Sequence, residues 1–183
     1  MSNKAVFLDR DNTLIEDPGY LADPDKVTLM PGVELALKSL RQAGYLLVVV
    51  SNQSGVARGL LTEETLEAIH AELRRRLAES GAHLDAIYYC PHHPEGTVEP
   101  YVCDCEDRKP APGMLLKAAR ELEINLSQSW MVGDGARDVE AGQRAGCRTI
   151  RLRRPEADAE TMTPAQDENA QADFTVRNLV DAA

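Results

Sequence analysis

Residues 4–13 read KAVFLDRDNT, a short apolar run that ends in a cluster of polar side chains. An apolar run of this length with polar boundaries is typical of a strand that is buried on both faces. A second run of the same kind, YLLVVV, covers residues 45–50 and is followed by the polar stretch SNQSG. Two such strands joined by a helical segment favour a parallel sheet, in which functional side chains follow the carboxyl ends of the strands.

The rest of the chain continues this alternation of strands and helices. Further strands are predicted at residues 86–89, 130–132, 149–152 and 174–176. Helical periodicity, closed in most cases by a glycine, covers residues 33–40, 66–77, 114–122 and 139–145, and Thr62 is a suitable N-cap for the second of these helices. We therefore predict an α/β fold with a doubly wound, mostly parallel sheet covered by helices on both faces.

The composition is that of an ordinary globular chain. Its 183 residues are 43% hydrophobic and 27% charged, which fits one domain over residues 1–183 and argues against a disordered or collagen-like chain. Acids outnumber Lys and Arg by 30 to 20, and the resulting charge of −10 disfavours nucleic-acid backbones and anionic membranes as partners. Without a membrane-spanning run or a signal peptide, we expect a cytoplasmic monomer. The acid-rich residues 155–173 are expected to form a solvated connection.

Carboxylates follow two of the predicted strands. Asp9 and Asp11 come directly after the first strand, where an extended backbone would point both side chains to one side. One could act as nucleophile or metal ligand and the other as general acid and base, although a turn also explains such a pair. Asp134 and Asp138 follow the strand at 130–132, and Asp134 could complete an oxygen-ligand Mg²⁺ site with Asp9 or simply cap the next helix.

Phosphate-binding groups are candidates at two further places. Ser51, Asn52, Gln53 and Ser54 follow the second strand and lead to a glycine, so hydroxyl, amide and backbone donors could meet a phosphate there. Lys109 lies between Arg108 and a proline just before a helix, where its point charge could neutralise a phosphoryl group. An ordinary polar loop and an ordinary surface lysine are the alternatives.

Three of the four cysteines gather in residues 90–108. Cys90 and His92 form a CxH pair, and Cys103 and Cys105 form a CxC pair after an intervening stretch that includes His93. Three thiolates and one imidazole are the expected donors of a closed, structural Zn²⁺ site. His92 fits the pairing, and His93 is the alternative ligand. We expect the metal to stabilise this loop rather than to activate water.

Taken together, these motifs resemble the haloacid dehalogenase superfamily of phosphohydrolases. That superfamily carries Asp-x-Asp-x-Thr after strand one, Ser or Thr after strand two, Lys before a helix and acids after strand four, and the resemblance covers residues 5–152. With the Cys and His loop the chain looks most like the D-glycero-D-manno-heptose-1,7-bisphosphate 7-phosphatases. The matching stretches are LDRDNTL, VVVSNQSGVARG, YYCPHHPEG, CDC, RKPAPGML and MVGDGARD.

The resemblance implies an activity and a set of residues. It implies a Mg²⁺-dependent phosphatase that makes a precursor of ADP-heptose or GDP-heptose for surface glycans such as lipopolysaccharide. Asp9 would be the nucleophile and Asp11 the general acid and base with a raised pKa, with Ser51 and Lys109 at the phosphoryl group. Mg²⁺ would be bound by Asp9, Asp11 and Asp134, with Asp138 behind them. Sugar-phosphate recognition would involve Arg10, Gly19, Tyr20, Asn52, Gln53, Ser54, Arg58 and Arg108.

Other functions remain open from the sequence. Histidinol-phosphate phosphatases share the acids and a shorter zinc loop, and a broader sugar-phosphate phosphatase is a further alternative. An inactive zinc module is disfavoured by the intact catalytic set, and a nucleic-acid end phosphatase by the acidic charge. Three positions depart from the family pattern: Asn12 replaces a glycine, Glu106 and Asp107 separate CDC from RKP, and Gly135 stands where a basic residue often follows the Gly-Asp pair.

Overall fold

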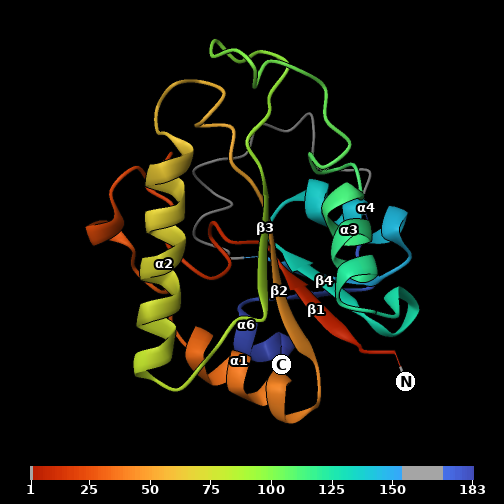
Figure 1. Cartoon of the computed structure of the whole chain (residues 1–183). Coiled ribbons are helices and arrows are strands. Elements are labelled where there is room, and N and C mark those ends of the chain that lie inside the picture. The colour runs from red at the N-terminus through yellow and green to blue at the C-terminus, as the bar shows by residue number, and fades with distance from the viewer. Residues whose placement is uncertain (1, 154–170) are drawn as a thin grey trace.

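The strands form a single parallel sheet in the computed structural model, which describes residues 2–153 and 171–183 (Figure 1). The order across the sheet is β3-β2-β1-β4-β5-β6, and every neighbouring pair is parallel. The strands are β1 (Ala5–Leu8), β2 (Leu46–Asn52), β3 (Ala86–Cys90), β4 (Trp130–Gly133), β5 (Arg148–Leu152) and β6 (Phe174–Val176). The predicted α/β class is confirmed, and the chain reverses its direction of travel across the sheet between β1 and β4, where such folds bind ligands.

Helices cover both faces of this sheet. They are α1 (Val33–Gln42), α2 (Glu63–Glu79), α3 (Gly113–Glu121), α4 (Ala136–Ala145) and α6 (Leu179–Ala182), with short 3₁₀ turns η1 (Pro24–Lys26) and η2 (Leu126–Gln128). In Figure 1, α1, α2 and α6 lie on one side of the sheet, and α3 and α4 lie on the other. The sequence did not predict α6, because four residues are too few to show a helical period.

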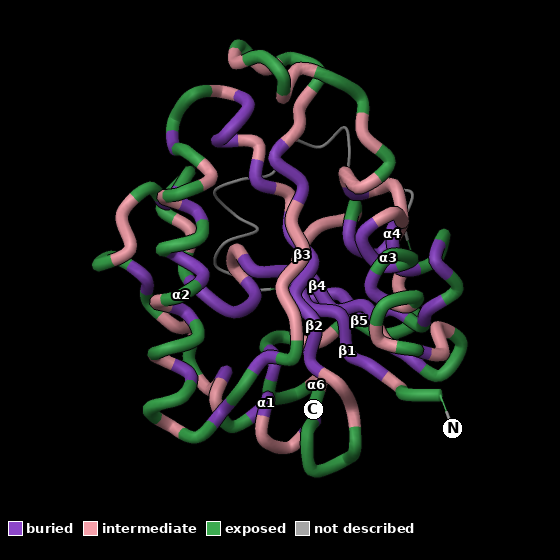
Figure 2. The backbone as a smooth tube through the Cα atoms, in the orientation of Figure 1, coloured by how far each residue is buried: buried purple, intermediate pink, exposed green. Residues whose placement is uncertain are grey.

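The core explains why β1 is apolar throughout. Val6 and Leu8 pack into the cluster that includes the apolar side chains of α1 and α2, whereas Ala5 and Phe7 pack into the cluster on the α3 and α4 side. Alternate residues of a strand point to opposite faces, so a strand covered on both sides has no position for a polar side chain. The centre of the sheet is accordingly the most continuously buried part of the molecule (Figure 2).

The local signals in the sequence act as expected at two turns. Thr62 caps α2, with its side-chain oxygen accepting a hydrogen bond from the backbone N–H of Thr65 at 3.1 Å. Asn12, in place of the family's glycine, adopts a left-handed backbone angle of φ 58°, which Asn tolerates better than most residues. Asn12 is therefore compatible with the left-handed backbone angle that this turn after β1 requires.

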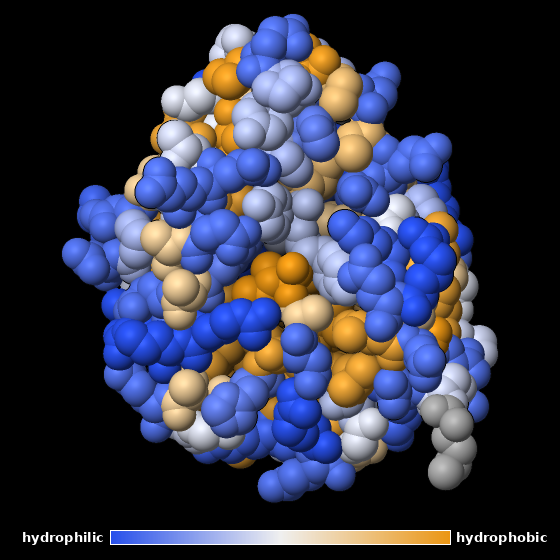
Figure 3. All heavy atoms as spheres, in the orientation of Figure 1, coloured by the Kyte–Doolittle hydropathy of each residue, from blue (hydrophilic) through white to orange (hydrophobic). Residues whose placement is uncertain are grey.

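The molecular surface is largely hydrophilic. In the face that Figure 3 shows, hydrophobic side chains gather mainly in a hollow between α2 and α3, where β3 is the edge of the sheet. Among the described helices, none combines the length and apolar character needed to span a bilayer. Of the acid-rich stretch predicted at 155–173, residues 155–170 lie outside the described residues. Asp173 is exposed, and its carboxylate accepts hydrogen bonds from the N–H and hydroxyl of Thr149 at 2.7 and 2.9 Å.

Candidate active site

Three carboxylates meet at the carboxyl ends of β1 and β4. Asp9 follows β1, Asp134 follows β4, and Asp138 comes from the first turn of α4. One carboxylate oxygen of each lies within 4.8 Å of the others. Asp138, which was predicted as a supporting acid behind the metal ligands, belongs to this group, and its Oδ2 also accepts a hydrogen bond from Gly135 N–H at 3.0 Å.

Lys109 reaches this group from the loop that precedes α3. Its Nζ lies 2.7 Å from Asp9 Oδ1 and 2.6 Å from Asp138 Oδ1, and it donates a hydrogen bond to the Val50 carbonyl at 2.7 Å. The lysine side chain is completely buried. Burial alone would lower the pKa of Lys109, but the carboxylates of Asp138 and Asp9 raise it, so the cation is retained. A buried positive charge is therefore fixed beside the Asp9 carboxylate.

Asn52 at the end of β2 holds Lys109 in place. Its side-chain amide donates to the Lys109 carbonyl and accepts from the Lys109 N–H, both at 2.9 Å. The sequence predicted a substrate contact for Asn52, whereas in the structure both ends of its amide are engaged by this backbone. Asn52 nonetheless lines the adjacent pocket.

Asp11 is held by a second hydrogen-bonded set. Arg10 Nε donates to Asp11 Oδ1 and Gln53 Nε2 donates to Asp11 Oδ2, each at 2.8 Å. Gln53 also donates to the Ser51 hydroxyl at 2.8 Å and accepts from Arg10 Nη2 at 2.9 Å. The other Arg10 nitrogen meets His70 Nε2 at 3.3 Å. Arg10 is almost fully buried, so its guanidinium orients Asp11 instead of standing free for substrate.

Two carboxyl groups of the site have raised pKa values. Burial raises the pKa of Asp11, against the opposing effect of Arg10 and with a further contribution from Asp9. Burial also raises the pKa of Asp134 to about 7, and the negative charges of Asp9 and Asp138 add to this effect. Three crowded carboxylates with one lysine form a donor set that a divalent cation would stabilise, because oxygen ligands of this kind suit Mg²⁺.

A pocket of about 190 Å³ opens beside these groups. It is lined by eight residues that the sequence had indicated: Arg10, Asp11, Gly19, Tyr20, Asn52, Gln53, Ser54 and Asp134. Its wall also includes Arg137, which the sequence analysis missed. The first turn of a helix that follows a catalytic strand faces the pocket, and that position was the available signal. Ser51 and Lys109 lie deeper, fully or almost fully buried.

The two remaining predicted arginines lie toward the loop between β3 and α3. Arg58 Nη2 meets His93 Nε2 at 3.2 Å, and Arg108 Nη1 donates to the His92 carbonyl at 3.2 Å. Neither residue lines the pocket of about 190 Å³. The charges of Arg137 and Arg58 contribute to a lowered pKa of Arg108, of which burial is the main cause. Cationic side chains are thus near one another at this side of the site.

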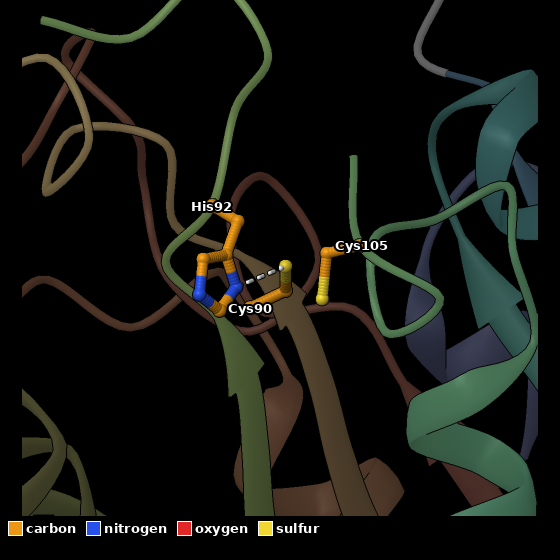
Figure 4. Close-up of side chains that lie close together, drawn as sticks. All are labelled: Cys90, His92 and Cys105. Carbon is orange, nitrogen blue, oxygen red and sulfur yellow. Dashed lines mark hydrogen bonds between the residues drawn. The ribbon is translucent and has the colours of Figure 1, made fainter. Parts of the chain in front are cut away.

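A second group of side chains that could hold a metal ion lies at the base of the same loop (Figure 4). One donor atom from each of Cys90, His92 and Cys105 lies within 4.8 Å of the others, with Cys90 Sγ 3.7 Å from His92 Nδ1. The predicted fourth ligand, Cys103, is exposed and outside this group. In the segment before Cys103, the Tyr101 carbonyl accepts hydrogen bonds from His93 N–H at 3.1 Å and from Cys103 N–H at 3.2 Å. The Cys103 thiol stays at the surface.

Comparison with known proteins gives the class of this site. The haloacid dehalogenase-like hydrolase family matches residues 15–146. Two relatives bear the name D-glycero-beta-D-manno-heptose-1,7-bisphosphate 7-phosphatase. The one from Yersinia pestis is 43% identical over 178 residues, which are 97% of this chain and 92% of the relative. The one from Escherichia coli (strain K12) is 45% identical over 179 residues, 97% of this chain and 90% of the relative.

Solved structures of similar proteins superpose on this chain. A HAD-like phosphatase from Mesorhizobium loti superposes with a TM-score of 0.82 at 33% identity, covering 99% of this chain and 86% of that chain. A D,D-heptose 1,7-bisphosphate phosphatase from B. bronchiseptica, solved with magnesium and phosphate, superposes with a TM-score of 0.79 at 33% identity, covering 98% and 95%.

The chain belongs to the haloacid dehalogenase-like hydrolases. Within that family it is an enzyme of the phosphatase class, a phosphoric monoester hydrolase. The predicted superfamily and enzyme class are confirmed.

Proposed function

We propose that this enzyme hydrolyses the 7-phosphate of D-glycero-D-manno-heptose 1,7-bisphosphate. The observation that carries the proposal is the meeting of Asp9, Lys109 and Asp134 beside a polar pocket that also contains Asp11. The substrate comes from the relatives from Y. pestis and E. coli, which bear that name and which the chain matches over nearly its whole length. The substrate is small and anionic, so a chain of charge −10 must bind it through local cations such as Lys109 and Arg137.

In the first step Asp9 attacks phosphorus. A bond forms between a carboxylate oxygen of Asp9 and phosphorus, and the bond between phosphorus and the sugar oxygen breaks. Asp11 protonates the departing sugar oxygen. Its raised pKa makes the protonated form available, and the hydrogen bonds from Arg10 and Gln53 fix its direction.

In the second step water cleaves the aspartyl-phosphate. Asp11, now a carboxylate, accepts a proton from the attacking water, and the phosphorus–oxygen bond to Asp9 breaks to release inorganic phosphate. Lys109 stands beside Asp9 in both steps, and Ser51 lies close by with its hydroxyl held by Gln53. Because negative charge spreads over the phosphoryl oxygens, these fixed donors stabilise the transition state electrostatically.

The same residues suit a magnesium ion. Asp9 and Asp134 would hold it, together with the backbone carbonyl of Asp11, and Asp138 supports the set through Lys109. When bound, Mg²⁺ neutralises charge on the phosphoryl oxygens and relieves the repulsion among the carboxylates. A structural Zn²⁺ would be bound by Cys90, His92, Cys103 and Cys105, with Cys103 drawn in by the metal.

The cellular setting is part of this proposal. The chain would act as a single-domain monomer in the cytoplasm, on the route to a nucleotide-activated heptose for surface glycans such as lipopolysaccharide. Its small, soluble substrate calls for neither a membrane nor a nucleic-acid partner, and the acidic surface agrees with that.

The test is phosphate release with Mg²⁺ from heptose 1,7-bisphosphate and, in parallel, from histidinol phosphate, on zinc-replete enzyme. We expect a strong preference for the bisphosphate in kcat/KM, and a loss of at least about a thousandfold in Asp9→Asn with the fold intact. Preference for histidinol phosphate would keep the chemistry and overturn the substrate. Substantial activity of Asp9→Asn would overturn the nucleophile.

A further inference from the structure

Arg137 is the one pocket cation that the mechanism leaves unused. It stands on the first turn of α4, is exposed, and lines the pocket beside Asp134, Asp11 and Tyr20. Among the residues that the structure describes, its guanidinium forms no ion pair with a carboxylate at 4.0 Å or less. By contrast, the pocket's other arginine, Arg10, is buried and bonded to Asp11, Gln53 and His70.

The Arg137 side chain lies beside Gly135. A Cβ placed on Gly135 would lie 3.4 Å from Arg137 Cγ and 3.6 Å from Arg137 Nε. Gly135 has an ordinary extended backbone, with φ −93° and ψ 153°, so the conformation itself does not demand glycine. Both distances are ordinary contacts, so a side chain at position 135 would begin beside the arginine. Arg137 therefore lies next to the place from which a basic side chain at position 135 would extend.

Arg137 keeps its positive charge at the pocket wall. Burial works against this charge, but the carboxylates of Asp138 and Asp9 outweigh it and raise the pKa of Arg137. Arg137 is near enough to Arg108 for its charge to contribute to the lowered pKa of Arg108, although Arg108 itself does not line the pocket. A guanidinium at the pocket wall can grip phosphate with two parallel hydrogen bonds.

We propose that Arg137 binds the phosphate of the substrate that is not removed. This inference rests on the proposed function and specifies how the second phosphate is recognised. The phosphoryl group that is transferred already has Lys109, which is fully buried beside Asp9. Arg137 is exposed at the pocket wall, so it is placed for a part of the substrate that extends outward from the reacting phosphorus.

The experiment compares two substrates in one variant. In Arg137→Ala, kcat/KM for heptose 1,7-bisphosphate should fall about 10- to 100-fold, mainly through KM, since one charge-assisted contact is lost. The fall for p-nitrophenyl phosphate, which has no second phosphate, should be at least about tenfold smaller. Arg75→Ala, which removes an exposed arginine paired with Glu72 on α2, is the control for loss of positive charge alone.

A second variant moves the cation back. Gly135→Lys in the Arg137→Ala background places a basic side chain in the space that the arginine has vacated, with Asp138 Oδ2 at 3.3 Å as the remaining tight contact. In this double variant the KM for the bisphosphate should return most of the way to the wild-type value. Thermal unfolding of each variant confirms that the protein is folded.

The outcomes separate the two proposals. If the wild type does not prefer the bisphosphate, the proposed function fails and this inference falls with it. If the wild type prefers the bisphosphate and Arg137→Ala keeps that preference, only the role of Arg137 is wrong. Equal losses on both substrates would also overturn it, because Arg137 would then serve the transferred phosphoryl group. Absence of recovery in the folded double variant would count against a purely electrostatic contact.

Discussion

His70 is a buried histidine whose neutral form the site requires. It lies on the inner side of α2, where its Nε2 meets Arg10 Nη1 at 3.3 Å, and Arg10 in turn orients Asp11. A neutral imidazole can accept the hydrogen bond from arginine, whereas a protonated one would place two cations together. Burial, followed by the charges of Arg10 and Arg74, lowers the pKa of His70 to about 3.

This shift predicts a specific acid sensitivity. The pKa of His70 is lower in the folded than in the unfolded chain, so protonation favours unfolding, and stability falls as the pH drops below about 6.5 and on toward 3. Between pH 7 and pH 5 the free energy of unfolding should fall about 2 kcal/mol more in the wild type than in His70→Gln. Urea unfolding at each pH measures this difference.

Glutamine is the suitable replacement because its amide oxygen can still accept from Arg10 without titrating. His83→Gln, at an exposed histidine, controls for the loss of a histidine elsewhere. Parallel pH profiles for the wild type and His70→Gln would show that His70 does not remain neutral in the folded enzyme.

At the level of single residues, the sequence predicted which side chains meet at the active site better than it predicted their hydrogen-bond partners. Asp9, Lys109 and Asp134 meet as their strand-end positions indicated, because parallel strands deliver their following residues to one edge. Asn52 and Arg10, which were predicted to bind substrate, line the pocket, and the structure shows in addition that they hold the Lys109 backbone and Asp11. Side-chain partners distant in sequence decide such roles, and no local pattern records them.

The helix α4 brings two site residues to the pocket, so its distance from the sheet matters. It packs on β4 and β5, with Gly142 on the side that faces them. A Cβ on Gly142 would lie 2.6 Å from Met131 Cβ and 2.9 Å from Thr149 Cγ2, both closer than such contacts allow. The glycine therefore sets how near the helix can approach the strands.

The packing predicts the opposite sign from helix propensity. Alanine in place of glycine within a helix usually stabilises by about 1 kcal/mol. Here Gly142→Ala should instead destabilise by about 1–3 kcal/mol, because α4 must move away from a closely packed sheet. Activity should fall as well, since Arg137 and Asp138 move with the helix. Urea unfolding and phosphate release measure the two effects.

The neighbouring Gln143→Ala provides the control, because Gln143 is exposed and its side chain is hydrogen-bonded only to the Gln171 carbonyl among the described residues. It should change stability by no more than about 0.5 kcal/mol. A Gly142→Ala enzyme as stable as the wild type would mean that the interface can adjust without cost.

At the level of helices and strands, the sequence predicted that the strands and the longer helices exist, but it predicted their first and last residues less accurately. The strand predicted at residues 45–50 extends over Leu46–Asn52, two polar residues further than its apolar run. The backbones of Ser51 and Asn52 pair with Tyr89 and Cys90 of β3, and that pairing, rather than side-chain character, sets the end of the strand. Such extensions place Ser51 inside the sheet, fully buried.

Across the whole molecule, the cysteine loop connects the edge of the sheet to the catalytic lysine. Cys90 closes β3, and Cys105 lies a few residues before Lys109. The segment between them is braced by hydrogen bonds from Arg108 N–H to the Cys105 carbonyl at 2.9 Å and from Arg108 Nη1 to the His92 carbonyl at 3.2 Å. A metal bound by Cys90, His92 and Cys105 would therefore fix the approach of both Arg108 and Lys109 to the site.

Removal of zinc is then expected to reduce activity because Arg108 and Lys109 lose their positions, and not because zinc takes part in the reaction. The purified enzyme should contain about one zinc per chain, as four protein ligands bind one ion. After chelation, removal of the chelator and full restoration of Mg²⁺, kcat/KM should remain at least about tenfold lower, because a misplacement of about 1 Å can cost that much or more. Zinc analysis and phosphate release measure both quantities.

Cysteine variants show which thiols bind the zinc ion. Cys105→Ser and Cys103→Ser should each lower the zinc content and make the loop after β3 more sensitive to protease, with Cys105→Ser also slowing phosphate release because Cys105 lies nearer Lys109. Cys147→Ala, at a buried cysteine outside the loop, should retain the metal. If Cys103→Ser keeps its zinc while Cys105→Ser loses it, the exposed Cys103 is not a ligand, and the site consists of the three residues that already lie together. An active enzyme that carries no zinc would overturn the structural role of the metal altogether.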